Sequence, residues 1–408
     1  MRRTRMLWEV FVMRFEDLLA RFTKRRLTAE EAGELLGMSG RQFRRLHSRY
    51  AQEGAEGLKD RRLGKPSTRR ADAGELARAC TLFRERYFDH TAKHAHEQLQ
   101  RHHGYRLSYT VTRLALQAAG LVKKAKRRSA HRKKRPRRPL PGMLLFQDGS
   151  RHRWLVGLDR LYDLVVTLDD ATSRIYSAIL VEEEGTQSSF LGLHETIAAQ
   201  GLFGAFYTDR GSHYFHTPKA GGRVDKSKLT QVGRALSQLG ITHIAAYSPE
   251  ARGRMERVFG TLQARLPAEL RVAGITTLEA ANRFLREHFI ADHNARFAVA
   301  AAEPGSAFVA YAGLPLGEVL CIQAPREVGR DNCVVWGGKS LQIPPQSHRH
   351  HYVRATVRVH EYPDASLAIF DGPRLLARYD RTGALVHARN QAAGPQGGHF
   401  VRSKRRTS

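Results

Sequence analysis

The segment MLLFQDGS, residues 143–150, gives the first clear indication of the fold in the middle of the chain. It begins with a short apolar run that ends at Asp148. DLVVTL, residues 163–168, is a second such run and ends at Asp169 and Asp170. An apolar run of about four to eight residues bounded by turn residues is typical of a buried strand. Both runs are therefore predicted to be strands that finish at carboxylates.

Helical and extended patterns alternate from there toward residue 300. Such alternation predicts an α/β fold, in which a mixed sheet is covered by helices. Further strands are expected over 175–181, 205–208 and 242–246, and helices over 186–199, 228–239 and from Pro249 to about Leu266.

Three carboxylates lie where this pattern can bring them together. Asp148 and Asp209 each follow directly on a predicted strand, and Glu256 lies in the helix that begins near Pro249. Burying three like charges together is unfavourable unless a cation neutralises them. Oxygen ligands with few Cys or His nearby favour Mg²⁺ or Mn²⁺. Two such ions can activate an attacking oxygen and stabilise a leaving one in phosphoryl transfer, so a site of this kind is expected here.

The net charge of +29 over 408 residues is distributed unevenly. It is +22 over residues 1–140, +1 over 141–302 and +6 over 303–408. A basic surplus confined to one part of a chain indicates a polyanionic partner, most simply nucleic acid. The densest block, KKAKRRSAHRKKRPRR at 123–138, has eleven Lys and Arg and no acid, which favours contact with DNA phosphates over a solvated spacer. Its predicted contacts are Lys123, Lys124, Lys126, Arg127, Arg128, Arg132, Lys133, Lys134 and Arg135.

Several classes of protein are disfavoured by composition. No apolar run reaches the roughly 18–20 residues that a membrane span needs, and the basic N-terminus lacks the features of a signal peptide. The three cysteines lie far apart, which argues against a disulfide framework and a zinc site and suits a reducing cytoplasm.

The N-terminal third has the pattern of a DNA reader. Thr28 is a predicted N-cap with Glu31 at the capping-box position, and Ser39 can cap a second helix over 40–52. Two helices joined by a short Gly turn predict a helix-turn-helix whose second helix reads DNA, with a generic basic hairpin as the alternative. The expected DNA contacts on that helix are Arg41, Gln42, Arg44, Arg45 and Arg49, of which Gln42 and Arg45 suit base reading.

A second helical set follows over about 72–120, with Ser108 as the N-cap of its last helix. Its histidines match no zinc-finger spacing. A polar helix surface is therefore the favoured interpretation for His90, His94, His96, His102 and His103.

Four ordered motifs resemble the catalytic core of bacterial insertion-sequence transposases, in particular the ISNCY group. They are FQDGS at 146–150 (followed by His152 and Trp154), LDDATS at 168–173, YTDRGS at 207–212 and SPEARGRMER at 248–257. The similarity continues through GTLQ at 260–263 and NARF at 294–297. It implies an integrase-type DDE domain with a ribonuclease H-like fold, preceded by helix-turn-helix DNA-binding modules.

The resemblance implies that Asp148, Asp209 and Glu256 are the catalytic, metal-binding triad, with Asp148 bridging two Mg²⁺ or Mn²⁺ ions. Glu250 is the competing third carboxylate, and Glu256 is preferred for its GRMER context and for sharing a helix face with Arg252 and Gln263. The resemblance leaves Asp169 and Asp170 with a structural role in the turn. DNA phosphate contact is favoured over a solvated helix face for Arg252, Arg254 and Arg257.

The last third contains short extended segments separated by turns. Five strands, over 332–336, 339–343, 351–359, 365–370 and 374–379, predict a small β-barrel. The histidines at 348, 350 and 351 are interpreted as a loop without metal. The sequence thus predicts a helix-turn-helix domain over 1–65, a second, helix-turn-helix-like helical domain over 66–122, a basic linker over 123–140, an integrase-type core over 141–302, a barrel over 325–385 and a disordered basic tail over 386–408.

The leading hypothesis is a DNA transposase that binds the ends of a mobile element, cleaves a strand there and transfers it to target DNA. Its partners would be double-stranded DNA and further copies of the chain, with no membrane. Its location would be the bacterial cytoplasm, at the nucleoid. A DNA-binding regulator with an idle core and a nuclease that only hydrolyses DNA remain as alternatives.

Overall fold

The computed structural model describes residues 2–60, 70–124, 135–219, 222–225, 227–247 and 249–386, and leaves the side chains of 2–6 and 249–252 undescribed. The predicted tail over 386–408 lies outside this description except for residue 386. The chain divides into two compact units, residues 1–76 and residues 77–408. No helix in the described part of the chain combines the length and apolar character needed to span a bilayer.

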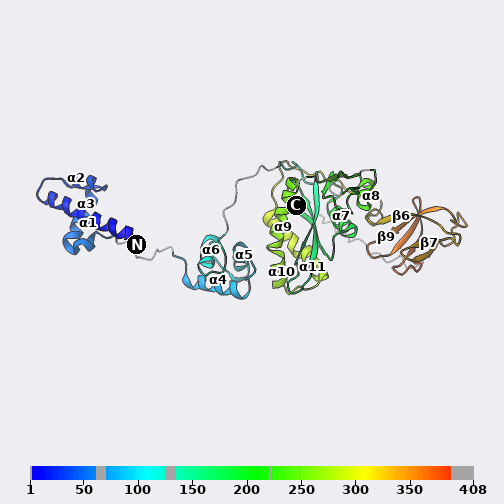
Figure 1. Cartoon of the computed structure of the whole chain (residues 1–408), viewed down its shortest axis with the longest axis horizontal. Coiled ribbons are helices and arrows are strands. Elements are labelled where there is room, and N and C mark those ends of the chain that lie inside the picture. The colour runs from blue at the N-terminus through cyan, green and yellow to red at the C-terminus, as the bar shows by residue number, and fades with distance from the viewer. Residues whose placement is uncertain are drawn as a thin grey trace, which may run out of the picture. The chain divides into compact units, whose positions relative to one another are not determined.

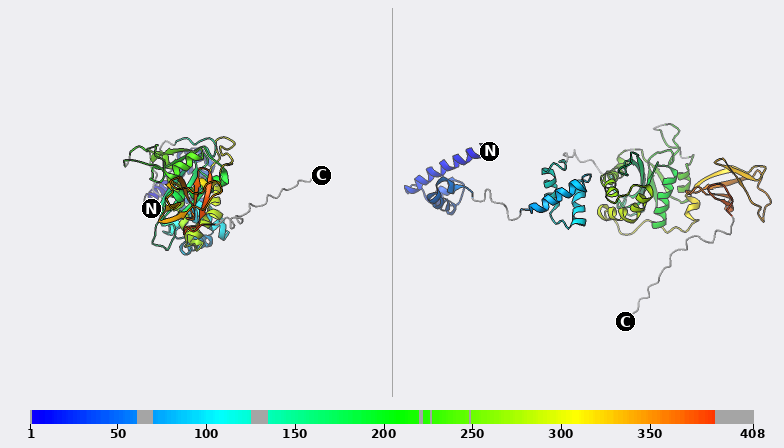
Figure 2. Two further views of the ribbon diagram at one scale, coloured as in Figure 1. Left: turned by 90° about the vertical axis from the view of Figure 1, so that its right-hand side faces the viewer. Right: turned by 90° about the horizontal axis from the view of Figure 1, so that it is seen from below.

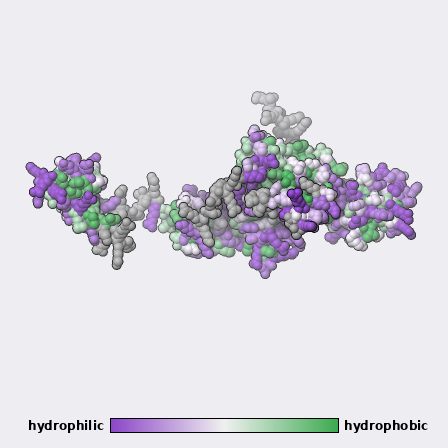
Figure 3. All heavy atoms as spheres, turned by 45° about the horizontal axis from the view of Figure 1, so that its top comes forward, coloured by the Kyte–Doolittle hydropathy of each residue, from purple (hydrophilic) through white to green (hydrophobic). Residues whose placement is uncertain are grey.

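The first unit is helical, as the sequence predicts. It contains α1 (Arg2–Thr23), α2 (Ala29–Leu35), α3 (Gly40–Glu53) and a 3-10 turn (Gly54–Leu58). The capping box is present: the Glu31 amide donates to Thr28 Oγ1 at 3.2 Å, and the Thr28 amide donates to Glu31 Oε2 at 2.7 Å. Ser39 caps α3 through the Gln42 amide. Phe15, Phe43 and Leu46 form the core, and the face of the unit drawn in Figure 3 has hydrophilic residues with hydrophobic patches between them.

The second helical module consists of α4 (Ala73–Glu85), α5 (Ala92–His103) and α6 (Tyr109–Ala118). The interpretation of its histidines as a polar surface is wrong for three of them, because His90, His94 and His96 are buried. Nε2 of His94 lies 2.9 Å from Glu269 Oε1 on α10 (Leu266–Val272), so the module packs on a helix of the core. Burial lowers the pKa of His90 to about 4, because an imidazolium is poorly solvated there.

The central element is a five-stranded mixed sheet. In the order in which they pair, its strands are β3 (Ile175–Val181), β2 (Tyr162–Asp169), β1 (Leu145–His152), β4 (Ala205–Thr208) and β5 (Thr242–Ala245). The first three strands pair antiparallel, whereas β1 with β4 and β4 with β5 pair parallel. The predicted α/β class is therefore observed.

Helices cover both faces of this sheet, as Figure 1 shows. One face packs against α9 (Pro249–Gln263), α10 and α11 (Leu278–Phe284), which contribute Met255, Leu270 and Ala281 among other apolar side chains. A π-helical turn (Leu285–Phe289) and α12 (Ile290–Phe297) follow. The other face packs against α7 (Thr186–Gln200) and α8 (Gln231–Gln238).

The C-terminal part contains two sheets and no closed barrel in the described residues, which corrects the predicted fold of this part. β6 (Ile322–Glu327), which follows the short α13 (Leu316–Val319), pairs with β9 (Thr356–Glu361), followed by β10 (Leu367–Asp371) and β11 (Arg374–Tyr379). β7 (Cys333–Trp336) and β8 (Lys339–Gln342) form a separate hairpin. Both sheets are drawn in orange and red in Figure 2 and share one apolar core that includes Val334, Val359 and Ile369.

Candidate active site on the central sheet

Asp148 and Asp209 are brought together by the strand register. β1 and β4 run parallel with Leu145 beside Phe206 and Phe146 beside Tyr207. The same register, continued along both chains, puts Asp148 beside Asp209. Neighbouring strands lie about 4.8 Å apart, so two carboxylates start from adjacent backbones. Asp148 is 9% exposed, whereas Asp209 is half-buried just beyond the end of its strand.

The pleat indicates the side of the sheet on which they lie. Phe146 packs in the core beneath α9, and Tyr207 packs against the same core. Side chains two residues apart on a strand share a face, so Asp148 lies on the face of Phe146, and Asp209 continues from Tyr207. Both aspartates therefore belong to the face that α9 covers.

Glu256 lies on α9, the helix that crosses this face. Met255 is buried against the sheet, while Glu256 itself is exposed. Two contacts fix the course of the helix. Near its start, Arg254 pairs with Asp170, which follows β2 opposite the start of β1. At its end, Gln263 Nε2 donates to Ser150 Oγ at 3.0 Å.

The course of α9 brings Glu256 to the flank that borders β1. The first half of α9 is held near the start of β1, and the end of α9 is held at Ser150, near the end of that strand. The helix therefore runs alongside β1 in the same direction. Glu256 and Gln263 are seven residues apart, about two helical turns, and so share a flank. Glu250 lies in the first turn of α9, and its side chain is outside the described part.

The three carboxylates do not form a ready-made metal cluster. No group of three His, Cys, Asp or Glu close enough to hold a metal ion is present among the residues that the structure describes. The donor chemistry nevertheless fits a hard cation, because all three predicted ligands are carboxylates and the two aspartates start from neighbouring positions.

Sequence reasoning missed a buried polar group next to Asp148. The Tyr214 hydroxyl donates to Gln147 Oε1 at 2.9 Å, and Gln147 Nε2 donates to Thr167 Oγ1 at 3.0 Å. Burial raises the pKa of Tyr214 well above its ordinary value, and the charges of Glu184, Asp209 and Asp148 raise it further. A neutral phenol thus supports the strand on which Asp148 lies.

Glu184 is a second residue that the sequence did not single out. A Cβ at Gly149 would lie 2.0 Å from Glu184 Oε2, so this carboxylate rests against the backbone that follows Asp148. His213 Nε2 lies 3.6 Å from Glu184 Oε1. The available signal was the glycine of the FQDGS motif, because a glycine in a strand often marks a close approach.

The predicted DNA contacts of α3 are mostly on its surface. Arg41, Gln42 and Arg45 are exposed. Arg44 is also exposed but pairs with Glu30 at 2.9 Å, and Arg49 donates to the Lys59 carbonyl at 2.8 Å. The last two side chains are therefore engaged within the helix-turn-helix unit.

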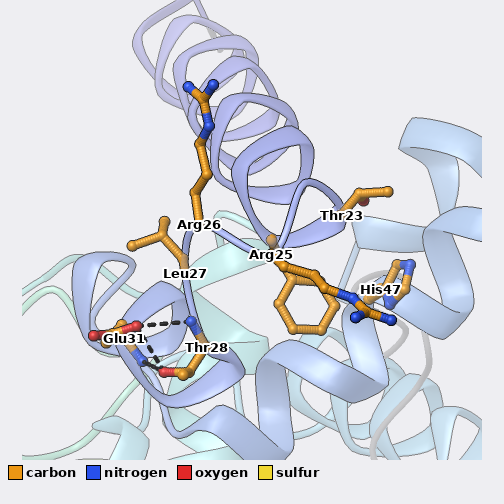
Figure 4. Close-up of a pocket in the computed structure, with 8 residues that line it drawn as sticks. Thr23, Arg25, Arg26, Leu27, Thr28, Glu31 and His47 are labelled. Atoms are coloured by element: carbon orange, nitrogen blue, oxygen red, sulfur yellow. Dashed lines mark hydrogen bonds between the residues drawn. The ribbon is translucent and has the colours of Figure 1, made fainter.

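A basic pocket lies beside these helices. Its lining includes Arg25, Arg26 and His47, with Glu31 and Thr28 joined by the capping box on one wall (Figure 4). Its two arginines and one histidine give the pocket a basic lining, which suits a polyanion.

The predicted contacts of the linker and of α9 have different surroundings. Lys123 and Lys124 are exposed. Arg135 and Arg254 both pair with Asp170, and Arg257 Nε donates to the Gly253 carbonyl at 2.9 Å. The side chains of Lys126, Arg127, Arg128, Arg132, Lys133, Lys134 and Arg252 lie outside the described part.

The turn role that the sequence gives to Asp169 is confirmed. Its carboxylate accepts hydrogen bonds from the Thr172 amide at 2.8 Å and the Thr172 hydroxyl at 2.6 Å, and from the Gly142 amide at 3.0 Å. Burial raises the pKa of this carboxyl despite these bonds, which lower it.

The chain is similar to several known proteins. A family model described as a helix-turn-helix domain matches residues 18–67. The transposase for insertion sequence IS1202 of Streptococcus pneumoniae is 34% identical over 151 residues, 37% of this chain and 32% of that protein. The putative transposase y4bF of Sinorhizobium fredii is 32% identical over 376 residues, 91% of this chain and 82% of that protein.

Two solved structures are more distant. The HTLV-2 integrase catalytic core domain in complex with magnesium, in its trimeric form, is 17% identical over 35% of this chain and 82% of its own, with a TM-score of 0.28. The simian T-cell lymphotropic virus intasome in complex with the PP2A regulatory subunit B56 gamma is 15% identical over 73% of this chain and 97% of its own, with a TM-score of 0.33. The family of this chain is shown by the proteins that are similar to it in sequence. Because y4bF is similar along most of both proteins, the chain belongs to the transposases of bacterial insertion sequences.

Proposed function

We propose that this transposase binds the ends of its element through its N-terminal helices, cleaves a DNA strand there and joins the freed end to target DNA. The observation that carries the proposal is the parallel register of β1 and β4, which starts Asp148 and Asp209 from adjacent backbones on the face that α9 covers. Membership of the transposase family and the helix-turn-helix match support the same function.

Asp148, Asp209 and Glu256 are the proposed catalytic residues and metal ligands. Glu256 is exposed on its flank of α9, so its side chain is free to change rotamer when a metal binds. The two aspartates are held more rigidly, because they lie on or directly after strands of the sheet. Bound there, a pair of Mg²⁺ or Mn²⁺ ions would supply the Lewis acidity that favours an attacking oxygen and a leaving one. The protein's own task is to hold the carboxylates in place and to align the phosphodiester.

The chemistry proceeds in two steps at one site. In the first step, water attacks the phosphodiester at the element's end and the 3′-oxygen leaves, which breaks one P–O bond and forms another. In the second step, that 3′-hydroxyl attacks a phosphodiester of the target, and the target's own 3′-oxygen leaves. Both steps exchange oxygens on phosphorus, so no covalent enzyme intermediate is needed.

The DNA contacts proposed for this reaction lie in the N-terminal part. Arg41, Gln42 and Arg45 are exposed on α3, the helix that would enter the major groove. The basic linker would add phosphate contacts that weaken with salt. Because two element ends must meet, we further propose that several copies of the chain assemble on DNA, in the bacterial cytoplasm at the nucleoid.

A cleavage and joining assay tests the proposal. The protein is incubated with terminal-repeat DNA of its element, a target plasmid and Mg²⁺ or Mn²⁺, and 3′ nicks and joined products are measured. Asp148→Asn, Asp209→Asn and Glu256→Gln should each abolish both products while leaving DNA affinity unchanged. Glu250→Gln is the matched control on the same helix and should remain active.

The outcomes separate the alternatives. Wild-type protein that binds the repeat but gives no product would be a regulator with an idle core. Nicks without joined products would indicate a nuclease that only hydrolyses DNA. An active Glu256→Gln beside an inactive Glu250→Gln would show that the third ligand has been assigned to the wrong residue.

A further inference from the structure

The buried carboxylate of Asp170 has more partners than a turn residue needs. Asp170 is fully buried and pairs with the guanidinium groups of both Arg135 and Arg254. Its Oδ2 also accepts a hydrogen bond from the Arg138 amide at 2.7 Å. A buried carboxylate is stable only when its charge is paired and its lone pairs are satisfied, and here two separate parts of the chain do so.

One of these parts is the last stretch of the basic linker. Arg137 donates to the Asp170 carbonyl at 2.9 Å and to Ser173 Oγ at 2.9 Å. The Arg135 guanidinium lies 6.0 Å from the ring centroid of Phe146, on the strand that carries Asp148. Residues 135–138 are therefore docked on the core at the end of β2, and are not merely a tether between domains.

The other part is the helix of Glu256. Arg254 lies on α9 two residues before Glu256, and its side chain is only 11% exposed. Besides its pair with Asp170, it donates from Nη2 to the Arg135 carbonyl at 2.7 Å. Charge-assisted hydrogen bonds in a guanidinium fork fix orientation as well as distance. Arg254 thus joins α9 directly to the linker.

We propose that Asp170 is a positioning residue that ties the end of the linker to the helix of the third catalytic carboxylate. Arg254 transmits the position of Asp170 to α9, so Glu256 is held on the flank beside β1. The linker that follows the DNA-reading modules is then a structural part of the active centre. The role of Glu256 rests on the proposed function, whereas the tie itself is a property of the folded chain.

The tie changes what is expected of Arg254. Its guanidinium neutralises a buried carboxylate and its side chain is only 11% exposed, so it acts inside the protein. The Arg135 side chain pairs with the same carboxylate but is 41% exposed, so it can still face a DNA phosphate. Arg257, which is exposed on the same helix and bonds only to a carbonyl of that helix among its described contacts, keeps the expected DNA role.

Hydrogen exchange on the full-length protein, without DNA or metal, tests the tie. The variants are Arg254→Gln and, as matched control on the same helix with the same loss of charge, Arg257→Gln. The first variant should speed exchange about tenfold both in α9 and at the Arg138 amide, a factor that corresponds to about 1.4 kcal/mol. The control should change neither. An Arg254→Gln protein whose Arg138 amide exchanges as in the wild type would overturn the proposal.

The metal requirement of strand cleavage tests the link to Glu256. At saturating DNA, Arg254→Gln should raise the Mn²⁺ concentration for half-maximal nicking several-fold, whereas Arg283→Gln, an exposed change with the same loss of charge on α11, should not. Equal effects of Arg254→Gln and Arg257→Gln on nicking and on DNA affinity would mean that Arg254 is only a DNA contact. If the Asp170→Asn protein folds, it should show the same effects as Arg254→Gln. If it does not fold, the comparison of Arg254→Gln with its control variants tests the tie.

The tie and the proposed function can be refuted separately. If the wild-type protein gives no nicks with any metal, but Arg254→Gln still speeds exchange of the Arg138 amide, the proposed function is wrong and the tie is supported. If the wild-type protein nicks DNA, and Arg254→Gln changes neither the exchange of the Arg138 amide nor the metal requirement, the tie is wrong and the proposed function is supported.

Discussion

Removing the charge of Glu318 should loosen the C-terminal sheets from the core at neutral pH and have little effect in acid. Glu318 lies on α13, whose neighbours Val319 and Leu320 pack in the core beneath α7 and α8. Its carboxylate accepts from Tyr362 at 2.6 Å and from Arg378 at 2.5 Å, and lies 3.1 Å from His360 Nδ1. One carboxylate therefore joins a core helix to side chains of β9 and β11 and of the residue after β9.

The size of the effect follows from the pKa of this carboxyl. Burial alone would raise it, but hydrogen bonds from His360, Tyr362 and Arg378 outweigh burial and lower the pKa from 4.5 to about 2. A tenfold change in proton affinity is worth about 1.4 kcal/mol, so the ionised group contributes about 3 kcal/mol. Because the folded pKa is the lower one, this contribution is complete above about pH 4.5. It is lost as the pH falls toward about 2.

Native-state hydrogen exchange of residues 356–379 measures this contribution. Glu318→Gln should lower the free energy of opening by about 3 kcal/mol at pH 7, and the difference from wild type should shrink as the pH falls from 4.5 to 2. Glu327→Gln, an exposed change in the same sheet, is the control and should have little effect. A Glu318→Gln protein that is as protected as wild type at pH 7, or as strongly weakened at pH 3 as at pH 7, would show that the ionised carboxylate does not hold the sheets in place.

Three further changes test other parts of the structure. Phe43→Ala removes a fully buried ring from the first unit and should cost about 3–5 kcal/mol, measured by exchange in α3. Arg45→Ala should weaken binding to element ends about tenfold in a fluorescence titration, more than the matched Arg21→Ala on α1, where the side chain already pairs with Asp17; equal losses would exclude base reading by Arg45. Gly201→Ala should lower the melting temperature, because Gly201 has φ +98° and a Cβ there would lie 2.3 Å from the Val309 carbonyl; an unchanged melting curve would contradict this.

Local signals in the sequence predicted much of the fold. The residues that cap helices are adjacent to the helices they start, so Thr28, Glu31 and Ser39 could be identified directly. The same holds for strands that finish at a carboxylate, because the apolar run and the acid are contiguous. β6 was missed because Pro325 and the charged residues after it obscure its alternation. The start of β9 was misplaced because Arg354, with φ +60°, still belongs to the turn before it.

What the sequence could not provide are contacts between distant residues. The tie between Asp170 and Arg254 spans 84 residues, and the pair of His94 with Glu269 spans 175. No rule of residue spacing predicts either pair. A histidine that the fold buries is indistinguishable in the sequence from one on the surface. The candidate site could be predicted from the sequence only in part. The two aspartates followed from strand ends, but the approach of Glu184 to Gly149 required the folded backbone.

A change of metal preference at Asp148 tests whether this residue is a metal ligand in strand cleavage. A thiolate ligand favours softer cations than a carboxylate does, so Asp148→Cys should give no nicking in Mg²⁺ and recover part of it in Mn²⁺. Asp163→Cys, on the neighbouring strand, is the control and should keep the wild-type preference. Recovery in Mn²⁺ confined to Asp148→Cys is the predicted result. Full activity of Asp148→Cys in Mg²⁺ would contradict the assignment of Asp148 as the ligand at the centre of strand cleavage.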